Sequence, residues 1–224
     1  MNKPYIISHM MTSVDGRIDC AMTEELPGEE YYPLLESLNA PTRVSGRVTA
    51  ELEMALPGKF DAKDTTPLNT SSYYKSVDAD AYEIIIDTKG TLLWEDSTTY
   101  DRPLLIVTSE SVTKEYLSYL ESKHISWIAC GSPRVHLKKI CELLYKEFKI
   151  ERMTVVGGGH INAAFLKEGL LDEISILIGA GIDGRANQPA VFDGLEEDHP
   201  VTVLKLSSVQ TYDSGAVWIR YTIA

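Results

Sequence analysis

Cysteine is scarce in this chain, and long apolar runs are absent. The 224 residues include three cysteines, Cys20, Cys130 and Cys141, with no Cys-x-x-Cys pair. We therefore expect a reduced, cytoplasmic protein with no zinc or other metal site. No apolar run reaches the length of a membrane-spanning helix, and the first residues lack the apolar core of a signal peptide. These absences predict that the chain has no membrane partner.

Basic residues are also in short supply. Lysine and arginine number 21 against 33 acidic residues, which gives a net charge of −12, and no run is rich in lysine or arginine. We therefore expect no binding to nucleic acid or to an anionic membrane. A negative chain can still bind a small phosphorylated molecule, because backbone N–H groups and a few placed arginines bind phosphate locally.

Several motifs of enzyme chemistry are missing. The chain has no Gly-x-Ser-x-Gly, no Walker lysine, and no His-x-Glu followed by Pro-Cys-x-x-Cys. These absences argue against a hydrolase nucleophile elbow, a P-loop and a zinc deaminase. His124, His136 and His199 do not cluster with cysteine.

The stretch over 151–173 predicts a strand, a glycine turn and a helix. Residues 153–156 are apolar and partly β-branched, as a buried strand requires. Three glycines follow at 157–159, and 160–168 shows helical spacing. Such a turn leaves backbone N–H groups at the positive end of the helix and lets phosphates approach the backbone. A tight turn without a ligand is the alternative interpretation of the same pattern.

Strands and helices alternate through the middle of the chain. We predict strands over 82–86, 104–107, 125–129 and 173–178, helices over 111–122 and 137–148, and an antiparallel hairpin within 201–223. Strands alternating with helices imply a mostly parallel sheet with helices on both faces. The pattern therefore predicts a single α/β domain over 1–224 with antiparallel edge strands at its C-terminal end.

Residues 59–80 are polar and show little periodicity. We predict a long loop there, with a turn of helix over 72–75. Loops of this length are uncommon in compact domains unless they are functional or mobile. A flap over a site and a variable insertion are the two interpretations.

Polar or glycine turns lie at several predicted strand ends, at 12–17, 46–49, 87–90, 108–110, 131–132 and 157–160. Ligands of open α/β sheets bind outside the carboxyl ends of the strands. We therefore expect these turns to form one ligand cleft. Arg47 lies at the start of a helix predicted over 49–56, where an arginine can bind a phosphate bidentately.

These turns together resemble the RibD C-terminal family, the reductase domain of the bifunctional deaminase–reductases of riboflavin biosynthesis. The matching segments are Ser13 to Ile18, Ile84 to Thr88, Gly157 to Glu173, and Phe192 to Gly194. Gly46 to Thr49 is also similar to the Gly-Arg-x-Thr turn of dihydrofolate reductases. The resemblance implies a dihydrofolate reductase-like three-layer sandwich and a homodimer.

The resemblance also implies an NADPH-dependent oxidoreductase that acts on a small molecule. It is similar to 5-amino-6-(5-phosphoribosylamino)uracil reductase, in which hydride passes to the ribosyl C1 of a pyrimidine intermediate. By this resemblance Gly157, Gly158, Gly159, His160 and Ile161 hold the cofactor's pyrophosphate, Gly46, Arg47 and Thr49 contact its phosphates, and Asp87, Thr88, Thr108 and Ser109 lie near its adenosine half. Ser13, Asp15 and Arg17 face the nicotinamide and the substrate, and Asp15 and Glu51 are the acids that orient or protonate the substrate.

Two departures from the family bear on the substrate. Val156 stands where the riboflavin enzymes usually carry a glutamate. Those enzymes also have an Asp-Asp-Pro motif after their second strand, and here only Glu51 could replace one of its acids. A reductase of the same fold with a dihydrofolate-like or small carbonyl substrate is therefore one alternative, and a non-catalytic nucleotide-binding module is another.

Asp87 could disfavour the 2′-phosphate of NADPH, whereas Arg47 could favour it; the resemblance favours NADPH. A carboxyl buried near the nicotinamide would have a raised pKa.

Overall fold

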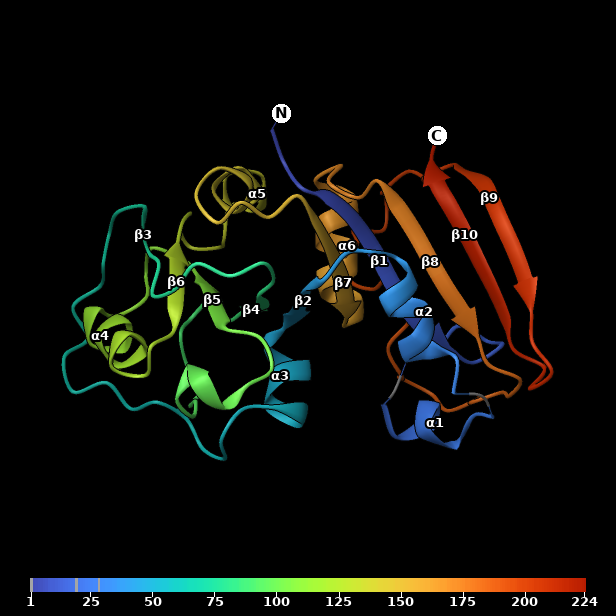
Figure 1. Cartoon of the computed structure of the whole chain (residues 1–224), viewed down its shortest axis with the longest axis horizontal. Helices are drawn as coiled ribbons and strands as arrows, with labels where there is room; N and C mark the ends of the chain where they lie inside the picture. Colours follow the sequence, from blue (N-terminus) through green and yellow to red (C-terminus); the bar gives the residue numbers. More distant parts are fainter. Residues whose placement is uncertain (1, 19, 28) are drawn as a thin grey trace. The chain divides into compact units, whose positions relative to one another are not determined.

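The computed structural model describes residues 2–18, 20–27 and 29–224 (Figure 1). The chain folds into two compact units. One contains residues 2–4 and 41–151, and the other contains the described residues of 5–40 and 152–224. We call them the middle unit and the terminal unit, and each is described by itself.

The terminal unit is built on five strands in the order β7-β1-β8-β10-β9 (Figure 1). These strands are β1 (Tyr5–Thr12), β7 (Arg152–Gly157), β8 (Glu173–Ile178), β9 (Leu204–Thr211) and β10 (Val217–Ile223). β7, β1 and β8 are parallel, whereas β10 and β9 are antiparallel to their neighbours. The antiparallel hairpin predicted within 201–223 is therefore confirmed.

Three helices belong to this unit: α1 (Cys20–Glu25), α2 (Tyr31–Ser37) and α6 (Gly159–Lys167). α2 buries Leu34 and Leu35 in a cluster with Ile7 and Trp218 of the sheet, as the helical spacing of its apolar residues requires. α6 ends at Lys167, Glu168 is its C-cap, and Gly169 follows with φ +64°. A glycine adopts this left-handed conformation without steric cost, which suits the end of a helix.

The middle unit has a second set of five strands, in the order β2-β4-β5-β6-β3. The strands are β2 (Thr42–Gly46), β3 (Ser72–Tyr74), β4 (Glu83–Ile86), β5 (Leu104–Thr108) and β6 (Ser126–Ala129); the helices are α3 (Arg47–Glu53), α4 (Lys114–Ser122) and α5 (Leu137–Lys146), with a 3₁₀ turn, η1 (Ser97–Thr99). The first four strands are parallel. β5 is buried along its whole length, as expected of a parallel strand covered on both faces.

The turn of helix predicted over 72–75 is wrong, because these residues form β3. Tyr73 pairs with Ile128, and the Tyr74 ring stacks on Trp127 at 6.4 Å between ring centroids. Tyrosine favours strands because its ring packs well on a pleated surface, and the open edge of β6 supplies the partner. The helix predicted over 49–56 is also shifted, since α3 begins at Arg47 and ends at Glu53.

The remainder of the 59–80 loop is tied to the middle unit. The Leu68 N–H donates to the Val112 carbonyl at 2.9 Å, and the Asn69 N–H donates to Glu110 at 2.9 Å. Phe60 packs edge-on against the Tyr116 ring, with ring centroids 5.1 Å apart. Apolar packing at Phe60 and backbone hydrogen bonds at Leu68 and Asn69 therefore hold the loop on the body of its own unit.

Candidate functional site

The glycine turn predicted at 157–159 joins β7 to α6. Gly157 is the last residue of β7 and has φ +137°, which strongly favours glycine. The peptide bond between Gly157 and Gly158 is cis. Gly158 is the N-cap of α6, and its carbonyl accepts from the Ile161 and Asn162 N–H groups. The first N–H groups of α6 therefore lie at the turn, where a helix attracts anions.

Gly159 is required by packing within the terminal unit. A β-carbon at this position would lie 2.2 Å from the carbonyl oxygen of Ala190. The Asp193 N–H also donates to the Gly159 carbonyl at 3.2 Å. A glycine is therefore needed at position 159 for the 190–193 segment to pack against the turn, whatever ligand the turn binds. His160 is exposed, and its ring lies beside Gly194.

The turn from Ser13 to Arg17 follows β1 and is closed by its own hydrogen bonds. The Ser13 hydroxyl donates to the Asp15 carboxylate at 2.7 Å and accepts from the Arg17 N–H at 3.1 Å. The Ser13 N–H donates to the Arg17 carbonyl, and the Gly16 N–H donates to the Ser13 carbonyl. Gly16 has φ +80°, so the Asp-Gly turn is confirmed. The turn brings together Ser13, Asp15 and Arg17, the three residues for which the family resemblance implies a place on the substrate side.

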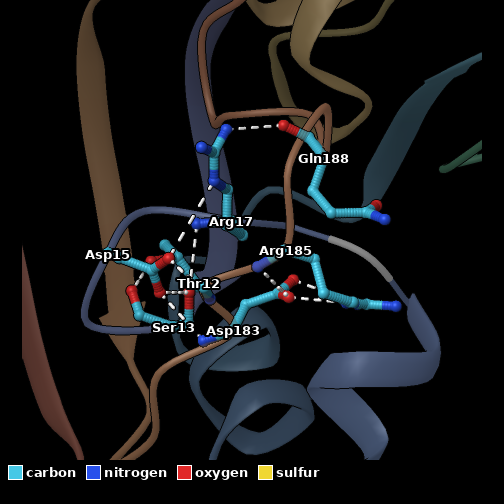
Figure 2. Close-up of polar contacts among 8 residues, drawn as sticks. Thr12, Ser13, Asp15, Arg17, Asp183, Arg185 and Gln188 are labelled. Carbon is cyan, nitrogen blue, oxygen red and sulfur yellow. Dashed lines mark hydrogen bonds and ion pairs between the residues drawn. The ribbon is translucent and has the colours of Figure 1, made fainter.

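Asp15 accepts two further hydrogen bonds, from a loop far away in the sequence (Figure 2). The Asp183 and Gly184 N–H groups each donate to its carboxylate at 3.0 Å. The Ser13 hydroxyl, followed by these two N–H groups, lowers the Asp15 pKa to about 2. Asp15 is exposed and its pKa is lowered, so the buried carboxyl with a raised pKa that we considered from the sequence is not found here.

The same loop is bound at several points by the 13–18 segment. The Arg17 guanidinium donates to the Gln188 carbonyl at 2.6 Å, and the Ile18 N–H donates to Pro189 at 3.1 Å. Within the loop, Arg185 binds the Asp183 carboxylate through Nε at 2.5 Å and Nη2 at 3.0 Å (Figure 2). The role of this loop could not be predicted from the sequence because the loop has no periodicity, although its Asp-Gly pair signals a turn.

In the middle unit, the residues assigned to the adenosine half close the turns at their strand ends. The Asp87 carboxylate is buried and accepts from the Thr91 and Leu92 N–H groups at 2.6 and 2.9 Å. The Ser109 hydroxyl is also buried and donates to the Thr88 carbonyl at 2.9 Å. The Asp87 carboxylate and the Ser109 hydroxyl therefore stabilise their own turns.

Two other buried hydroxyls at strand ends of this unit do not form such hydrogen bonds within the described residues. Ser45 precedes Gly46 at the end of β2, and Thr108 ends β5. Neither hydroxyl oxygen has a hydrogen-bond partner among the described residues. A buried hydroxyl without a partner is unfavourable, and a polar group of a bound ligand would satisfy it.

Arg47 and Glu51 are brought together on α3. Gly46 is the N-cap of this helix, and Thr49 is half-buried in its first turn. The Arg47 guanidinium donates to the Glu51 carboxylate at 2.6 Å, one helical turn away, and both side chains are about 40% exposed. The predicted phosphate ligand and the predicted acid therefore form a surface ion pair.

The described residues show neither a metal cluster nor a membrane-spanning helix. They contain no group of three or more His, Cys, Asp or Glu side chains that could hold a metal ion. Within the same residues, no helix is both long and apolar enough to cross a bilayer.

Comparison with known proteins gives the family of this fold and turn pattern. The RibD C-terminal domain matches residues 4–218. The chain belongs to this family. The family membership predicted from the glycine turn and its neighbours is therefore confirmed.

Solved structures confirm the fold of this RibD C-terminal domain. A pyrimidine reductase-like protein from Corynebacterium diphtheriae has a TM-score of 0.72 at 17% identity, with 100% of this chain and 93% of that chain covered. The riboflavin biosynthesis reductase of Saccharomyces cerevisiae has a TM-score of 0.64 at 20% identity, with 100% and 91% covered. The predicted dihydrofolate reductase-like α/β class, mostly parallel with antiparallel C-terminal strands, is confirmed.

Curated relatives of this RibD C-terminal domain are named reductases. The 2,5-diamino-6-ribosylamino-4(3H)-pyrimidinone 5′-phosphate reductase of Methanothermobacter thermautotrophicus is 24% identical, over 99% of each chain. The reductase of the same name from Aquifex aeolicus is 27% identical, over 87% of this chain and 84% of its own. These relatives support a reductase role.

Proposed function

We propose that this chain is an NADPH-dependent reductase of riboflavin biosynthesis. Its substrate would be a ribosylaminopyrimidine 5′-phosphate, which accepts hydride at the ribosyl C1. The observation that carries the proposal is the full-length match to a reductase named for the 2,5-diamino-pyrimidinone phosphate. This relative favours the diaminopyrimidinone over the aminouracil that the family resemblance implied.

The glycine turn fits the phosphate groups of the cofactor. Gly157 and Gly158 carry no side chain, and the start of α6 presents backbone N–H groups, so Gly157 to Ile161 would hold the pyrophosphate. Bound NADPH would supply the hydride, whereas the protein supplies binding and orientation. The names of the related reductases imply a bound reductant, and we propose that this reductant is the nicotinamide cofactor NADPH.

In the middle unit, Gly46, Arg47 and Thr49 are proposed as phosphate contacts. The Arg47 guanidinium is exposed at the start of α3, which suits a phosphate ligand, although it would have to exchange the Glu51 carboxylate for the phosphate. Thr88 and Thr108 remain candidates for the adenosine half, since Thr88 is half-buried and the Thr108 hydroxyl has no partner among the described residues. The role predicted for Glu51 as an acid stays a prediction.

The turn of the terminal unit is proposed for the substrate side. The Arg17 guanidinium is held beside the Asp15 carboxylate, with 4.0 Å between Nε and the nearest oxygen, and both side chains are about one-third exposed. Ser13 is buried and fixes the turn through its hydroxyl. We propose Arg17 as the group of this turn that contacts the anionic substrate.

A reductase of the same fold with another substrate is the runner-up. Val156 is half-buried and packs against the apolar cluster that contains Ile7 and Leu34. It therefore offers no polar group to a substrate at the position where the riboflavin enzymes usually have a glutamate. A non-catalytic nucleotide-binding module is the alternative of a different class.

Turnover of candidate substrates tests the proposal. The full chain would be incubated with NADPH and each of the two phosphorylated ribosylaminopyrimidines, and the loss of NADPH absorbance followed. We expect substrate-dependent oxidation, faster with the diaminopyrimidinone. Oxidation with dihydrofolate or a small carbonyl compound alone would favour the runner-up. No oxidation with any of them, but tight NADPH binding, would indicate the binding module.

We also propose that the chain forms a homodimer through β9 and β10. The pairing of β9 with β10 contains a β-bulge. Ser208 pairs with Arg220 and Leu206 pairs with Tyr221, so Ser207 has no partner residue of its own in the register. This bulge places Leu206 and Val209 on one face of the sheet, where they are 55% and 54% exposed. A second copy would cover this apolar face and the open edge of β9. The cytoplasmic location stays a prediction.

A further inference from the structure

We infer that Asp15 is a positioning residue that acts on the cofactor cradle through the 181–193 loop. In this inference its carboxylate holds the loop, and the loop in turn holds Gly159 and the start of α6. Loss of the carboxylate would then weaken NADPH binding and leave the chemical step nearly intact. The inference rests on the proposed function, because it assigns NADPH to the glycine turn.

The first link is between Asp15 and the loop. Its carboxylate accepts the Asp183 and Gly184 N–H groups at 3.0 Å each (Figure 2). The Val14 N–H donates to the Gly181 carbonyl at 2.8 Å, two residues before Asp183. These three hydrogen bonds join segments about 167 residues apart in the sequence, so they fix the start of the loop on the turn that follows β1.

The second link holds the later part of the loop. The Arg17 guanidinium donates to the Gln188 carbonyl at 2.6 Å, and the Ile18 N–H donates to Pro189 at 3.1 Å. Arg17 and Ala190 also form an isolated antiparallel bridge. The turn after β1 therefore determines where the Ala190 carbonyl lies.

The third link runs from the loop to the glycine turn. The Ala190 carbonyl oxygen occupies the space where a Gly159 β-carbon would be, at 2.2 Å. The Asn162 side-chain amide donates to the Val191 carbonyl at 2.7 Å, and the Asp193 N–H donates to the Gly159 carbonyl. Asn162 and Gly159 are both buried. A displacement of the loop would therefore move, or leave unsupported, the first turn of α6.

The surroundings of Asp15 suit this role better than proton donation. The Ser13 hydroxyl and two backbone N–H groups already occupy its oxygens, and the Arg17 guanidinium faces it. The other charged groups of the cluster are the Asp183 carboxylate and the Arg185 guanidinium, which bind each other. Asp15 stays ionised at neutral pH, since these donors hold its pKa at about 2. It therefore has no proton to give to a substrate.

The test is Asp15→Asn in the full chain, with Asp198→Asn as the matched control. The asparagine keeps the size of the side chain, but its amide nitrogen cannot accept from the Asp183 or Gly184 N–H. We expect the NADPH dissociation constant and the KM for NADPH to rise about tenfold, as loss of a charge-assisted hydrogen bond would give. At saturating NADPH, kcat should stay within about threefold of the wild-type value. Asp198 is exposed, and its variant should match the wild type.

Two kinetic results would overturn the inference. If kcat falls about 100-fold or more while the NADPH dissociation constant is unchanged, Asp15 takes part in the chemical step. If neither quantity changes, the loop does not transmit the effect of Asp15. Ser13→Ala is a second variant, in case Asp15→Asn fails to fold. It removes one donor from the carboxylate and should raise the KM for NADPH in the same direction by a smaller factor.

Hydrogen exchange of the ligand-free protein tests the link without any cofactor. Asp15→Asn should speed exchange of the Asp183 and Gly184 amides and of the amides at 159–162. Faster exchange at 183–184 alone would contradict transmission to the cradle. If the wild-type chain binds no NADPH, the proposed function fails, but this exchange pattern still decides whether Asp15 supports the glycine turn.

Discussion

A β-carbon on Gly159 would lie 2.2 Å from the carbonyl oxygen of Ala190. Neither group can move freely, because Gly159 begins α6 and the 190–193 segment is hydrogen-bonded to that helix. The start of the proposed cofactor cradle is therefore built against a loop of the same unit. Substitutions at Gly159 test this relationship.

Gly159→Ala should destabilise the chain by about 3 kcal/mol, because the new methyl group overlaps a backbone oxygen. It should also weaken NADPH binding. Gly169→Ala is the matched control: nothing lies within 4 Å of its β-carbon position, so only its φ of +64° is strained. We expect a loss of about 1 kcal/mol there, with unchanged NADPH binding. Urea unfolding measures both, and equal losses would contradict the close approach.

Arg47→Gln should raise the dissociation constant of NADPH about tenfold, since the exposed guanidinium is the proposed phosphate ligand of α3. The wild-type affinity should fall with added salt, and the variant should show a weaker salt dependence. Arg134→Gln, at another exposed arginine of the same unit, is the control. An unchanged affinity in Arg47→Gln would exclude Arg47 from the cofactor site.

Glu51→Gln distinguishes two possible roles of the Glu51 carboxylate, as the ion-pair partner of Arg47 or as an acid that acts on the substrate. If Glu51 only pairs with Arg47, the variant frees the guanidinium, and the KM for NADPH should fall about twofold with kcat unchanged. If Glu51 orients or protonates the substrate, as the sequence comparison implies, kcat should fall about 100-fold or more. Steady-state kinetics at saturating NADPH separate the two results.

His9 should make the stability of the chain depend on pH. It is buried, its Nδ1 lies 2.8 Å from the Ser175 hydroxyl, and its ring stacks on Tyr31. Burial lowers its pKa from 6.5 to about 4, so the unfolded chain binds a proton between these values and the folded chain does not. Above pH 6.5 His9 is neutral in both states and its contribution to the stability of the folded chain is fully present. That contribution is lost as the pH falls toward 4, by about 3 kcal/mol in total.

His9→Gln removes the titrating group. Urea unfolding between pH 7 and about pH 4 should therefore show a smaller loss of stability in the variant than in the wild type. Equal slopes would mean that the His9 pKa is not lowered in the folded protein, contrary to the effect expected of its burial.

Leu206→Asp with Val209→Asp should prevent the proposed dimer, because both side chains lie on the exposed apolar face of the hairpin. Analytical ultracentrifugation should find a wild-type dimer at micromolar concentration and a monomeric variant. Val201→Asp is the control outside β9, at a side chain that is 91% exposed. A monomeric wild type would sink the dimer proposal.

Much of the fold can be predicted from local patterns. The strand expected over 173–178 is confirmed with the same bounds, because isoleucine, a β-branched residue that favours strands, recurs at every second position from 174 to 178. The helix after the glycines is confirmed within one residue at each end. By contrast, α1 and β3 were not expected, since neither short segment has a clear period and β3 depends on the open edge of β6.

The site is less predictable than the fold, because its contacts join distant residues. Asp15 stands out at a strand end, but its partners at 183–184 cannot be read from a local pattern. Asp87 is also at a strand end, yet its buried carboxylate is taken up by the N–H groups of Thr91 and Leu92. Position at a strand end therefore predicts where a ligand could bind but not which side chains face it.

The proposal of an NADPH-dependent reductase is tested most directly by a calorimetric titration of the purified full chain with NADPH and with NADH. We predict tight binding of NADPH and much weaker binding of NADH, with NADPH binding reduced in both Gly159→Ala and Asp15→Asn. No binding of either nucleotide would mean that the 157–159 turn serves packing alone, and it would contradict the reductase assignment.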